Sequence, residues 1–282
     1  MKCAWDTYIN LVPLYLRQDV DRLGKENLEE LRLRIGRPPE LIISGRSMLL
    51  DGIIVKSDLE FVINIASRYS PWTSSSIKKG YITAPGGHRV GICGEVVMSQ
   101  GCVHNIATVT SVCLRVARDF IGIGEGITRL PGSILIIGSP GSGKTTLLRD
   151  IIRTRSNAEG GLISVVDERR EIFPMDGDTY CFDPGLRTDI LSGCNKLQGI
   201  EMVLRTMNPS VIAVDEITAK EDCDAIIHAA WCGIRLIATV HAENRRDLMM
   251  RPLYEQLLHN GIFRNLIIVK KDKSWSVEKV SE

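Results

Sequence analysis

The sequence predicts an α/β protein with a mostly parallel sheet, preceded by a smaller mixed α/β domain. Two observations support this class. In the second half of the chain, apolar runs typical of buried strands alternate with amphipathic helical patterns, and such alternation produces parallel sheets that are buried on both faces. One apolar run also leads directly into a glycine-rich loop and then into a helical pattern, over residues 133–155.

The elements of the second half follow in order along the chain. Strands are expected at 133–137, 162–166, 211–214, 235–240 and 265–270, and helices near 144–155, 196–207, 219–231 and 245–259. Ligands of open parallel sheets bind outside the carboxyl ends of the strands. Polar residues that directly follow these strands are therefore the candidates for function.

The first half has a different pattern. A helix is expected over 5–20 and another over 57–69, which a capping box of Ser57 and Glu60 would open. Strands are expected at 31–35, 41–43, 48–50, 80–83, 89–97 and 111–116. Three glycines within 121–126 favour a flexible linker over a tight turn. The predicted domains are therefore 1–121 and 133–282, with a glycine-rich hinge over 122–132.

Composition limits the classes of function. The chain has 282 residues and a formal net charge of +1, so no overall field draws it to nucleic acid or to an anionic membrane. Its eight cysteines form no C-x-x-C pair, which favours reduced thiols in a cytosolic protein over zinc ligands or disulfides. No apolar run approaches the ~20 residues of a membrane-spanning helix. Any membrane role is therefore expected to come through a partner protein.

A complete phosphate-binding loop follows the strand at 133–137. It consists of Gly138, Ser139, Pro140, Gly141, Ser142, Gly143, Lys144, Thr145 and Thr146. A strand, G-x-x-x-x-G-K-T and a helix together form a site in which backbone N–H groups and the helix N-terminus surround a polyphosphate. Lys144 is placed for the β- and γ-phosphates, and the Thr145 hydroxyl is placed for Mg²⁺. The sequence therefore predicts a site for a nucleoside triphosphate such as ATP.

An acidic pair follows the strand at 211–214. In such a site Asp215 would hold Mg²⁺, and Glu216 would polarise the attacking water. The alternative is a pair of carboxylates favoured by the N-terminus of the next helix. The phosphate loop in the same chain favours the catalytic interpretation.

Two further strand ends carry polar side chains. Glu168 and Glu171 follow the strand at 162–166, where they could support water activation or metal binding, or form a salt-bridged loop with the arginines between them. The residues alone favour neither interpretation. His241 follows the strand at 235–240 and is a candidate contact for the γ-phosphate.

Arginines of the first half are candidates for another role. Phosphoryl transfer needs positive charge near the γ-phosphate, often from outside the catalytic core. Arg89 and Arg115 lie on predicted strands before the hinge. For each arginine by itself, a place on a solvated basic face is the favoured interpretation. At least one of the two is nevertheless a candidate to reach the nucleotide.

Four motifs in order resemble the type II/type IV secretion ATPases, a branch of the RecA-like NTPases. They are GSPGSGKTT at 138–146, VVDERRE at 165–171, VIAVDE at 211–216 and DAIIHAAWCGIRLIATVHAEN at 224–244. Within this branch, GGHRVGICGEVV at 86–97 and SVCLRVAR at 111–118 resemble the stage III sporulation protein AA family. The chain departs from the usual secretion ATPase at Val214, where those proteins have Gly, and at Ile234, where they have His.

The resemblance implies a RecA-like P-loop core that hydrolyses ATP with Mg²⁺. It implies a ring, a hexamer of this chain, in the mother-cell cytoplasm of an endospore former, where it would drive a membrane-embedded channel or secretion complex. It leaves open whether Glu168 or Glu171 has the family's role. The alternatives are a nucleic-acid-dependent motor, disfavoured by an aromatic content of 5%, and a non-hydrolytic nucleotide switch, disfavoured by the intact acids.

Overall fold

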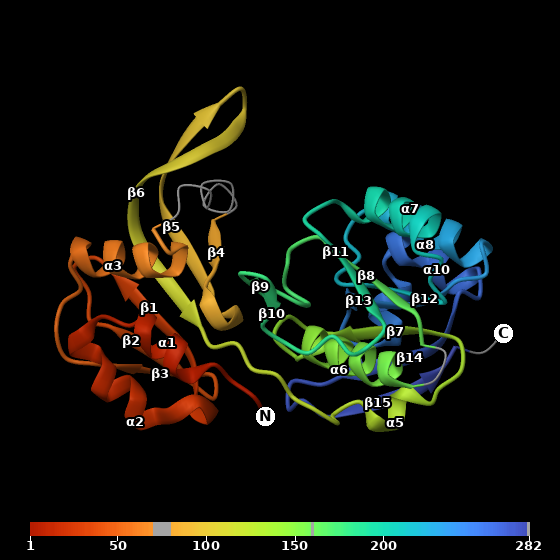
Figure 1. Ribbon diagram of the computed structural model, residues 1–282, viewed down its shortest axis with the longest axis horizontal. Helices are drawn as coiled ribbons and strands as arrows, with labels where there is room; N and C mark the ends of the chain where they lie inside the picture. The colour runs from red at the N-terminus through yellow and green to blue at the C-terminus, as the bar shows by residue number, and fades with distance from the viewer. Residues whose placement is uncertain (70–79, 159–160, 281–282) are drawn as a thin grey trace. The chain divides into compact units, whose positions relative to one another are not determined.

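The computed structural model describes residues 1–69, 80–158 and 161–280. The chain forms two compact units, each described here by itself (Figure 1). The first unit contains residues 1–119 together with 175–181, and the second contains 120–174 and 182–282. The short hairpin of β9 (Met175–Asp176) and β10 (Thr179–Tyr180) therefore belongs to the first unit, although the flanking chain belongs to the second.

The first unit is built on a six-stranded sheet with the order β3-β2-β1-β6-β5-β4, in which every neighbouring pair is antiparallel. Its strands are β1 (Leu28–Arg34), β2 (Glu40–Ile43), β3 (Arg46–Leu49), β4 (Tyr81–Thr83), β5 (Arg89–Ser99) and β6 (Cys102–Arg115). Its helices are α1 (Trp5–Leu11), α2 (Arg17–Asn27) and α3 (Lys56–Ser67), with short 3-10 turns at Leu14–Leu16 and Pro85–Gly87. The predicted mixed α/β class of this half is confirmed.

Alternation along the strands sets the core of the first unit. Leu31 and Leu33 of β1 are fully buried, and they pack with Leu41 of β2 and Leu114 of β6. The residues between the two leucines face the other side of the sheet, because successive strand side chains point to opposite faces. Arg32 is accordingly only half-buried, as the alternating apolar and basic pattern predicted.

Two local predictions for the first unit are wrong. The helix expected over 5–20 is interrupted at Pro13, which has no backbone N–H to continue it. The predicted capping box is also absent, because α3 begins one residue earlier than expected. The Asp58 carboxylate accepts a hydrogen bond from the backbone N–H of Val55 at 2.9 Å, and Glu60 instead lies 3.5 Å from the Lys56 ammonium.

The second unit is built on a seven-stranded sheet with the order β11-β8-β12-β13-β7-β14-β15. All neighbouring strands are parallel except the edge pair of β14 and β15. The strands are β7 (Ser133–Gly138), β8 (Ile163–Asp167), β11 (Thr188–Ser192), β12 (Val211–Val214), β13 (Arg235–His241), β14 (Phe263–Val269) and β15 (Trp275–Lys279). The prediction of a mostly parallel sheet is confirmed.

The helices of the second unit are α5 (Glu125–Thr128), α6 (Lys144–Asn157), α7 (Lys196–Thr206), α8 (Lys220–Trp231), α9 (Arg245–Met249) and α10 (Pro252–His259). Every residue of the central strands β7 and β12 is buried, which explains why their apolar runs were so clear in the sequence. The single helix expected over 245–259 is divided, since Pro252 begins α10 at its first position. Among the described residues, no helix combines the length and the hydropathy needed to cross a bilayer.

The segment that opens the second unit is anchored at two places. The buried carboxylate of Asp150, on α6, accepts hydrogen bonds from the backbone N–H groups of Gly122 at 3.0 Å and Gly124 at 2.7 Å. The indole N–H of Trp275 donates to the Ile123 carbonyl at 2.9 Å. The boundary predicted at residue 121 and the hinge predicted over 122–132 stay predictions.

Candidate functional site

The strand order brings three distant stretches of sequence to one edge of the second sheet. β13 lies between β7 and β12 and is parallel to both. His241, the last residue of β13, is the register partner of Gly138, the last residue of β7. Asp215 directly follows β12. The carboxyl ends of these strands therefore place the phosphate loop, the histidine and the acidic pair together.

Glycine is required at the start of the loop and within it. A Cβ added to Gly138 would lie 2.5 Å from the Ser142 hydroxyl and 2.6 Å from the Val269 carbonyl, so a side chain has no room there. Gly141 and Gly143 have φ values of +73° and +102°, a left-handed region that favours glycine. The loop thus turns tightly between β7 and α6, which begins at Lys144.

Lys144 is buried and makes three polar contacts. Its ammonium donates to the carbonyl oxygens of Gly138 at 2.8 Å and Ser139 at 3.0 Å, and it lies 2.9 Å from Nδ1 of His241. Burial lowers the pKa of Lys144, and the nearby carboxylates of Asp215 and Glu216 oppose this shift. An ammonium can only donate, so Nδ1 of His241 accepts and its Nε2 carries the hydrogen.

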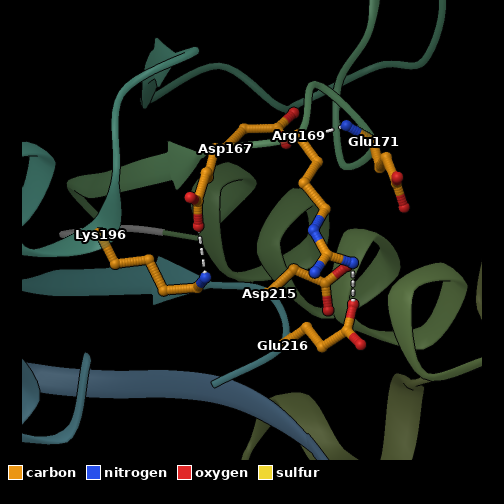
Figure 2. Close-up of a pocket in the computed structure, with 7 residues that line it drawn as sticks. Asp167, Arg169, Glu171, Lys196, Asp215 and Glu216 are labelled. Atoms are coloured by element: carbon orange, nitrogen blue, oxygen red, sulfur yellow. Dashed lines mark hydrogen bonds and ion pairs between the residues drawn. The ribbon is translucent and has the colours of Figure 1, made fainter. Parts of the chain in front are cut away.

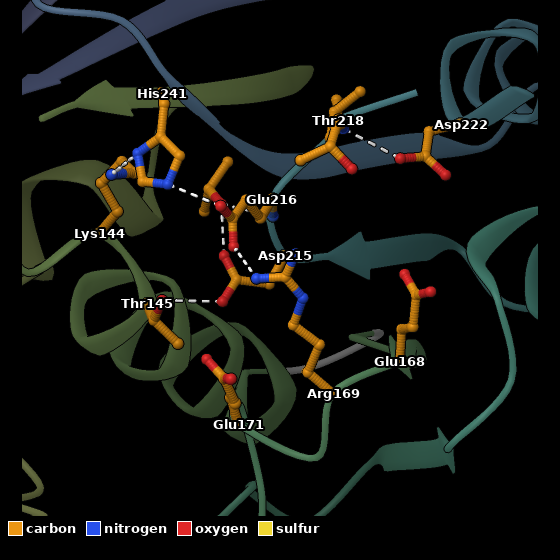
Figure 3. A network of polar contacts seen from close by, with 12 residues as sticks. Lys144, Thr145, Glu168, Arg169, Glu171, Asp215, Glu216, Thr218, Asp222 and His241 are labelled. Carbon is orange, nitrogen blue, oxygen red and sulfur yellow. Dashed lines mark hydrogen bonds and ion pairs between the residues drawn. The ribbon is translucent and has the colours of Figure 1, made fainter. Parts of the chain in front are cut away.

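The same histidine reaches the acidic pair. His241 Nε2 lies 2.7 Å from Oε1 of Glu216, whose other carboxylate oxygen lies 2.5 Å from the guanidinium of Arg169 (Figure 3). Glu216 has φ +49°, an uncommon conformation for a residue with a long side chain. Backbone strain of this kind is often found where the side chain has a functional role.

Thr239 organises the acidic pair from the central strand. The Thr145 hydroxyl donates to Oδ2 of Asp215 at 2.7 Å, and the fully buried Thr239 hydroxyl donates to the other oxygen. Thr239 also accepts from the backbone N–H of Glu216 at 2.7 Å. Thr239 was not predicted as a site residue. The sequence did contain an indication. Thr239 is a polar residue in an apolar strand, and it lies two positions before His241 and therefore on the same face of the strand.

The loop after β8 contains a carboxylate that shapes the backbone. Asp167 is buried and accepts hydrogen bonds from the backbone N–H groups of Glu171, Ile172 and Phe173, at 2.9, 3.0 and 3.0 Å. Burial raises the pKa of Asp167, against the opposing effect of these hydrogen bonds. Asp167 therefore fixes the turn that presents Glu168 and Glu171.

A small pocket lies beside this turn and is partly open to solvent (Figure 2). It is lined by five carboxylates and two cations, namely Asp167, Glu168, Glu171, Asp215, Glu216, Arg169 and Lys196. Figure 2 shows Arg169 extending to Glu216. Both predicted candidates of the acidic loop, Glu168 and Glu171, therefore line the same pocket as the acidic pair.

Lys196 was not predicted as a site residue. It is the first residue of α7, and a lysine at this position has no sequence pattern that indicates a functional role. Its side chain is only 4% exposed, and its ammonium lies 2.7 Å from the carboxylate of Glu168. A second carboxylate, that of Asp222, lies 3.6 Å away. The charge of Glu168 is thus engaged by a buried cation.

The two candidate arginines belong to the first unit. Arg89 and Arg115 are register partners on β5 and β6. The Arg115 guanidinium lies 2.8 Å from the Glu30 carboxylate, and that of Arg89 lies over the ring of Tyr81 at 4.2 Å from its centroid. Both side chains therefore lie on one face of the first sheet.

The donor set at the loop fits Mg²⁺ bound together with phosphate. The described residues contain no group of three or more His, Cys, Asp or Glu side chains that could hold a metal ion. Mg²⁺ is commonly bound through one or two carboxylates plus substrate phosphates, which matches Asp215 beside the Thr145 hydroxyl. The buried Ser142 hydroxyl, within the loop, has no hydrogen-bond partner among the described residues. A phosphate oxygen would satisfy it.

A family model described as "Sporulation stage III, protein AA" matches residues 8–279. The chain belongs to the stage III sporulation protein AA family. One relative in this family is Stage III sporulation protein AA of Bacillus subtilis (strain 168), which is 37% identical over 258 residues, or 87% of this chain and 83% of that protein. Protein SEEDLING PLASTID DEVELOPMENT 1 of Arabidopsis thaliana is 28% identical over 91% of this chain, which spans 36% of that protein.

Solved structures show that this chain shares a fold with the ATPases DotB and PilT. The ATPase DotB of Legionella pneumophila superposes with a TM-score of 0.61 at 17% identity, covering 94% of this chain and 79% of DotB. The pilus retraction motor PilT, solved with bound ADP, superposes with a TM-score of 0.59 at 19% identity, covering 91% of this chain and 77% of PilT. Both the predicted fold class and the resemblance to this branch are confirmed.

Proposed function

We propose that the chain is an Mg²⁺-dependent ATPase that works as a motor of the secretion-ATPase type. The observation that carries this proposal is one continuous set of contacts, from Lys144 through His241 to Glu216 and from Thr145 to Asp215. These are the residue types that bind and hydrolyse a triphosphate, gathered at the carboxyl edge of a parallel sheet.

Each side chain has a distinct task in this proposal. Lys144, the loop amides and the N-terminus of α6 hold the β- and γ-phosphates. Thr145 and Asp215 hold Mg²⁺, which when bound neutralises charge on the phosphate oxygens. Lys144 and Thr145 both have internal partners, so phosphate and Mg²⁺ would replace some of their existing contacts.

Glu216 is proposed to orient the attacking water, and His241 to link its position to the occupancy of the γ-phosphate site. We propose that Glu168 or Glu171, which line the same pocket as Glu216, supplies the second carboxylate near the water. We further propose that Arg89 or Arg115 supplies positive charge to a nucleotide of the same chain or of a neighbouring copy.

At the level of assembly, we propose a ring of identical copies, a hexamer, in the cytoplasm of the mother cell. It would energise a membrane-embedded channel or secretion complex during endospore formation. Membership of the sporulation family and the fold shared with DotB and PilT support this proposal.

The test is turnover by the purified chain with Mg²⁺ and ATP or GTP. We expect hydrolysis that Lys144→Ala abolishes, and undiminished hydrolysis by Lys144→Ala would refute the site. Addition of single-stranded DNA or RNA in the same assay should leave the rate unchanged. Mass measurement with and without a non-hydrolysable ATP analogue tests the ring, and a monomer under both conditions would refute it.

A further inference from the structure

The turn that joins β14 to β15, residues 270–274, lies at the same edge of the sheet as the phosphate loop. β14 runs parallel to β7, with Ile268 as the register partner of Ile137. The Val269 carbonyl oxygen lies only 2.6 Å from the place where a Cβ of Gly138 would be. The residues that follow Val269 therefore leave the sheet beside the start of the phosphate loop.

The backbone of this turn is fixed by its own hydrogen bonds. The N–H of Lys270 donates to the Ser274 carbonyl at 2.9 Å, and the N–H of Lys273 donates to the Lys270 carbonyl at 3.0 Å. The Asp272 carboxylate accepts from the backbone N–H of Ser274 at 3.0 Å and from its hydroxyl at 2.6 Å. Lys273 itself is held at φ +70°. The direction of the Lys273 side chain is therefore set by an ordered and strained turn.

Lys273 contacts the phosphate loop directly. Its ammonium donates a hydrogen bond to the carbonyl of Gly141, and its Cδ atom lies 3.7 Å from the place where a Cβ of Gly143 would be. The side chain is exposed. A neutral carbonyl is a weaker partner for an ammonium than a phosphate oxygen is, so a bound polyphosphate would attract Lys273 away from Gly141.

The side of the loop from which Lys273 approaches decides which phosphate it meets. Asp215 and Glu216 follow β12, which lies on the β13 side of β7. Lys273 follows β14, which lies on the opposite side of β7. The acidic pair marks the end of the polyphosphate where water attacks. Lys273 is therefore next to the other end, where the phosphates join the nucleoside.

We propose that Lys273 is a second lysine of the nucleotide site, which contacts the phosphates nearest the nucleoside and sets affinity rather than rate. This inference rests on the proposed function. A contact with those phosphates is shared by ADP, ATP and the transition state. Such uniform binding lowers KM and leaves kcat unchanged.

The test compares Lys273→Met with Lys271→Met in the full-length chain. Lys271 is exposed on the same turn and makes no hydrogen bond or ion pair with the loop among the described residues. Calorimetry should show that Lys273→Met raises the Kd of ADP and of a non-hydrolysable ATP analogue by the same factor, roughly three- to tenfold for one exposed charged contact. Lys271→Met should change neither, and Lys273→Arg should restore most of the loss. The kcat of Lys273→Met should stay at the wild-type value while its KM rises.

Two results would overturn this inference and leave the proposed function standing. One is wild-type affinity in Lys273→Met while the unsubstituted chain binds both nucleotides. The other is a fall in kcat with no change in Kd, which would place Lys273 at the γ-phosphate. Failure of the unsubstituted chain to bind any nucleotide would instead overturn the proposed function and this inference with it.

Discussion

The Lys144 ammonium and Nδ1 of His241 lie 2.9 Å apart. In this arrangement the imidazole accepts a hydrogen bond from the loop lysine and donates one from Nε2 to the Glu216 carboxylate, at 2.7 Å. His241 thereby connects the group that would hold the phosphates to the group that would orient water. The contact depends on the charge state of Lys144, which gives the first prediction.

Nucleotide affinity should fall at alkaline pH sooner than an ordinary lysine would allow. Burial lowers the pKa of Lys144 from 10.5, and only its protonated form attracts phosphate. Affinity should therefore be full below the lowered pKa and decline as pH rises through it. The Kd of ADP measured between neutral pH and pH 10.5 tests this. Lys144→Arg should bind more weakly, but its affinity should decline less over this range because arginine stays protonated. A constant Kd in the unsubstituted chain up to pH 10.5 would contradict the prediction.

Glu216→Gln should retain nucleotide binding and lose turnover by roughly 100-fold or more, the scale of general-base catalysis. The amide keeps the size of the side chain and removes the charge that faces His241 and Arg169. Binding by calorimetry and turnover under the same conditions separate the two effects. Wild-type turnover would move the water-orienting role to the loop after β8.

Glu168→Gln should lower the stability of the chain. The substitution removes the nearer of the two carboxylates that face the buried Lys196, at 2.7 Å, and should lower the free energy of unfolding. The expected loss is about 1–2 kcal/mol, less than for a fully buried pair because the Glu168 side chain is partly exposed. Chemical denaturation measures this loss, and turnover by Glu168→Gln and by Glu171→Gln under the same conditions tests which carboxylate acts near the water. An unchanged free energy of unfolding in Glu168→Gln would show that its contact with Lys196 does not stabilise the chain.

Thr239→Val should impair both stability and turnover. Valine has nearly the same shape, but it removes the acceptor for the backbone N–H of Glu216 at 2.7 Å and the donor to Asp215. Leaving a buried N–H unpaired costs about 1–3 kcal/mol, and the lower end applies here because this hydrogen bond is partly buried. Thr239→Ser keeps the hydroxyl and is the matched control. If the two variants had the same free energy of unfolding and the same rate of ATP turnover, the hydroxyl would have no part in holding the acidic pair.

Linear motifs made part of the site predictable. The loop from Gly138 to Thr146 and the pair at Asp215 and Glu216 follow strands that are buried along their whole length, so the sequence marked both the residues and the edge at which they lie. Two strands at the edges of the second sheet were harder to predict from the sequence. β11 has no buried residue, β15 is largely exposed, and both carry polar residues, so their patterns do not differ from those of loops.

Contacts that depend on strand order were not predictable. Nothing local to Lys196 indicates that it faces Glu168, 28 positions earlier, or that Arg169 reaches Glu216 across 47 positions. The pair of Arg169 and Glu216 arises because β8 and β12 are neighbours in the sheet, and that of Lys196 and Glu168 because β8 and β11 are neighbours. The first position of α7 and the turn after β8 therefore meet only once the sheet has formed.

The buried carboxylate of Asp150 has a mechanical consequence. It lies six residues after Lys144 on α6, less than two helical turns away, and it holds the amides of Gly122 and Gly124. A helix this short moves as a rigid rod. A tilt of its first turn by an arriving anion would therefore also move the segment that opens the second unit.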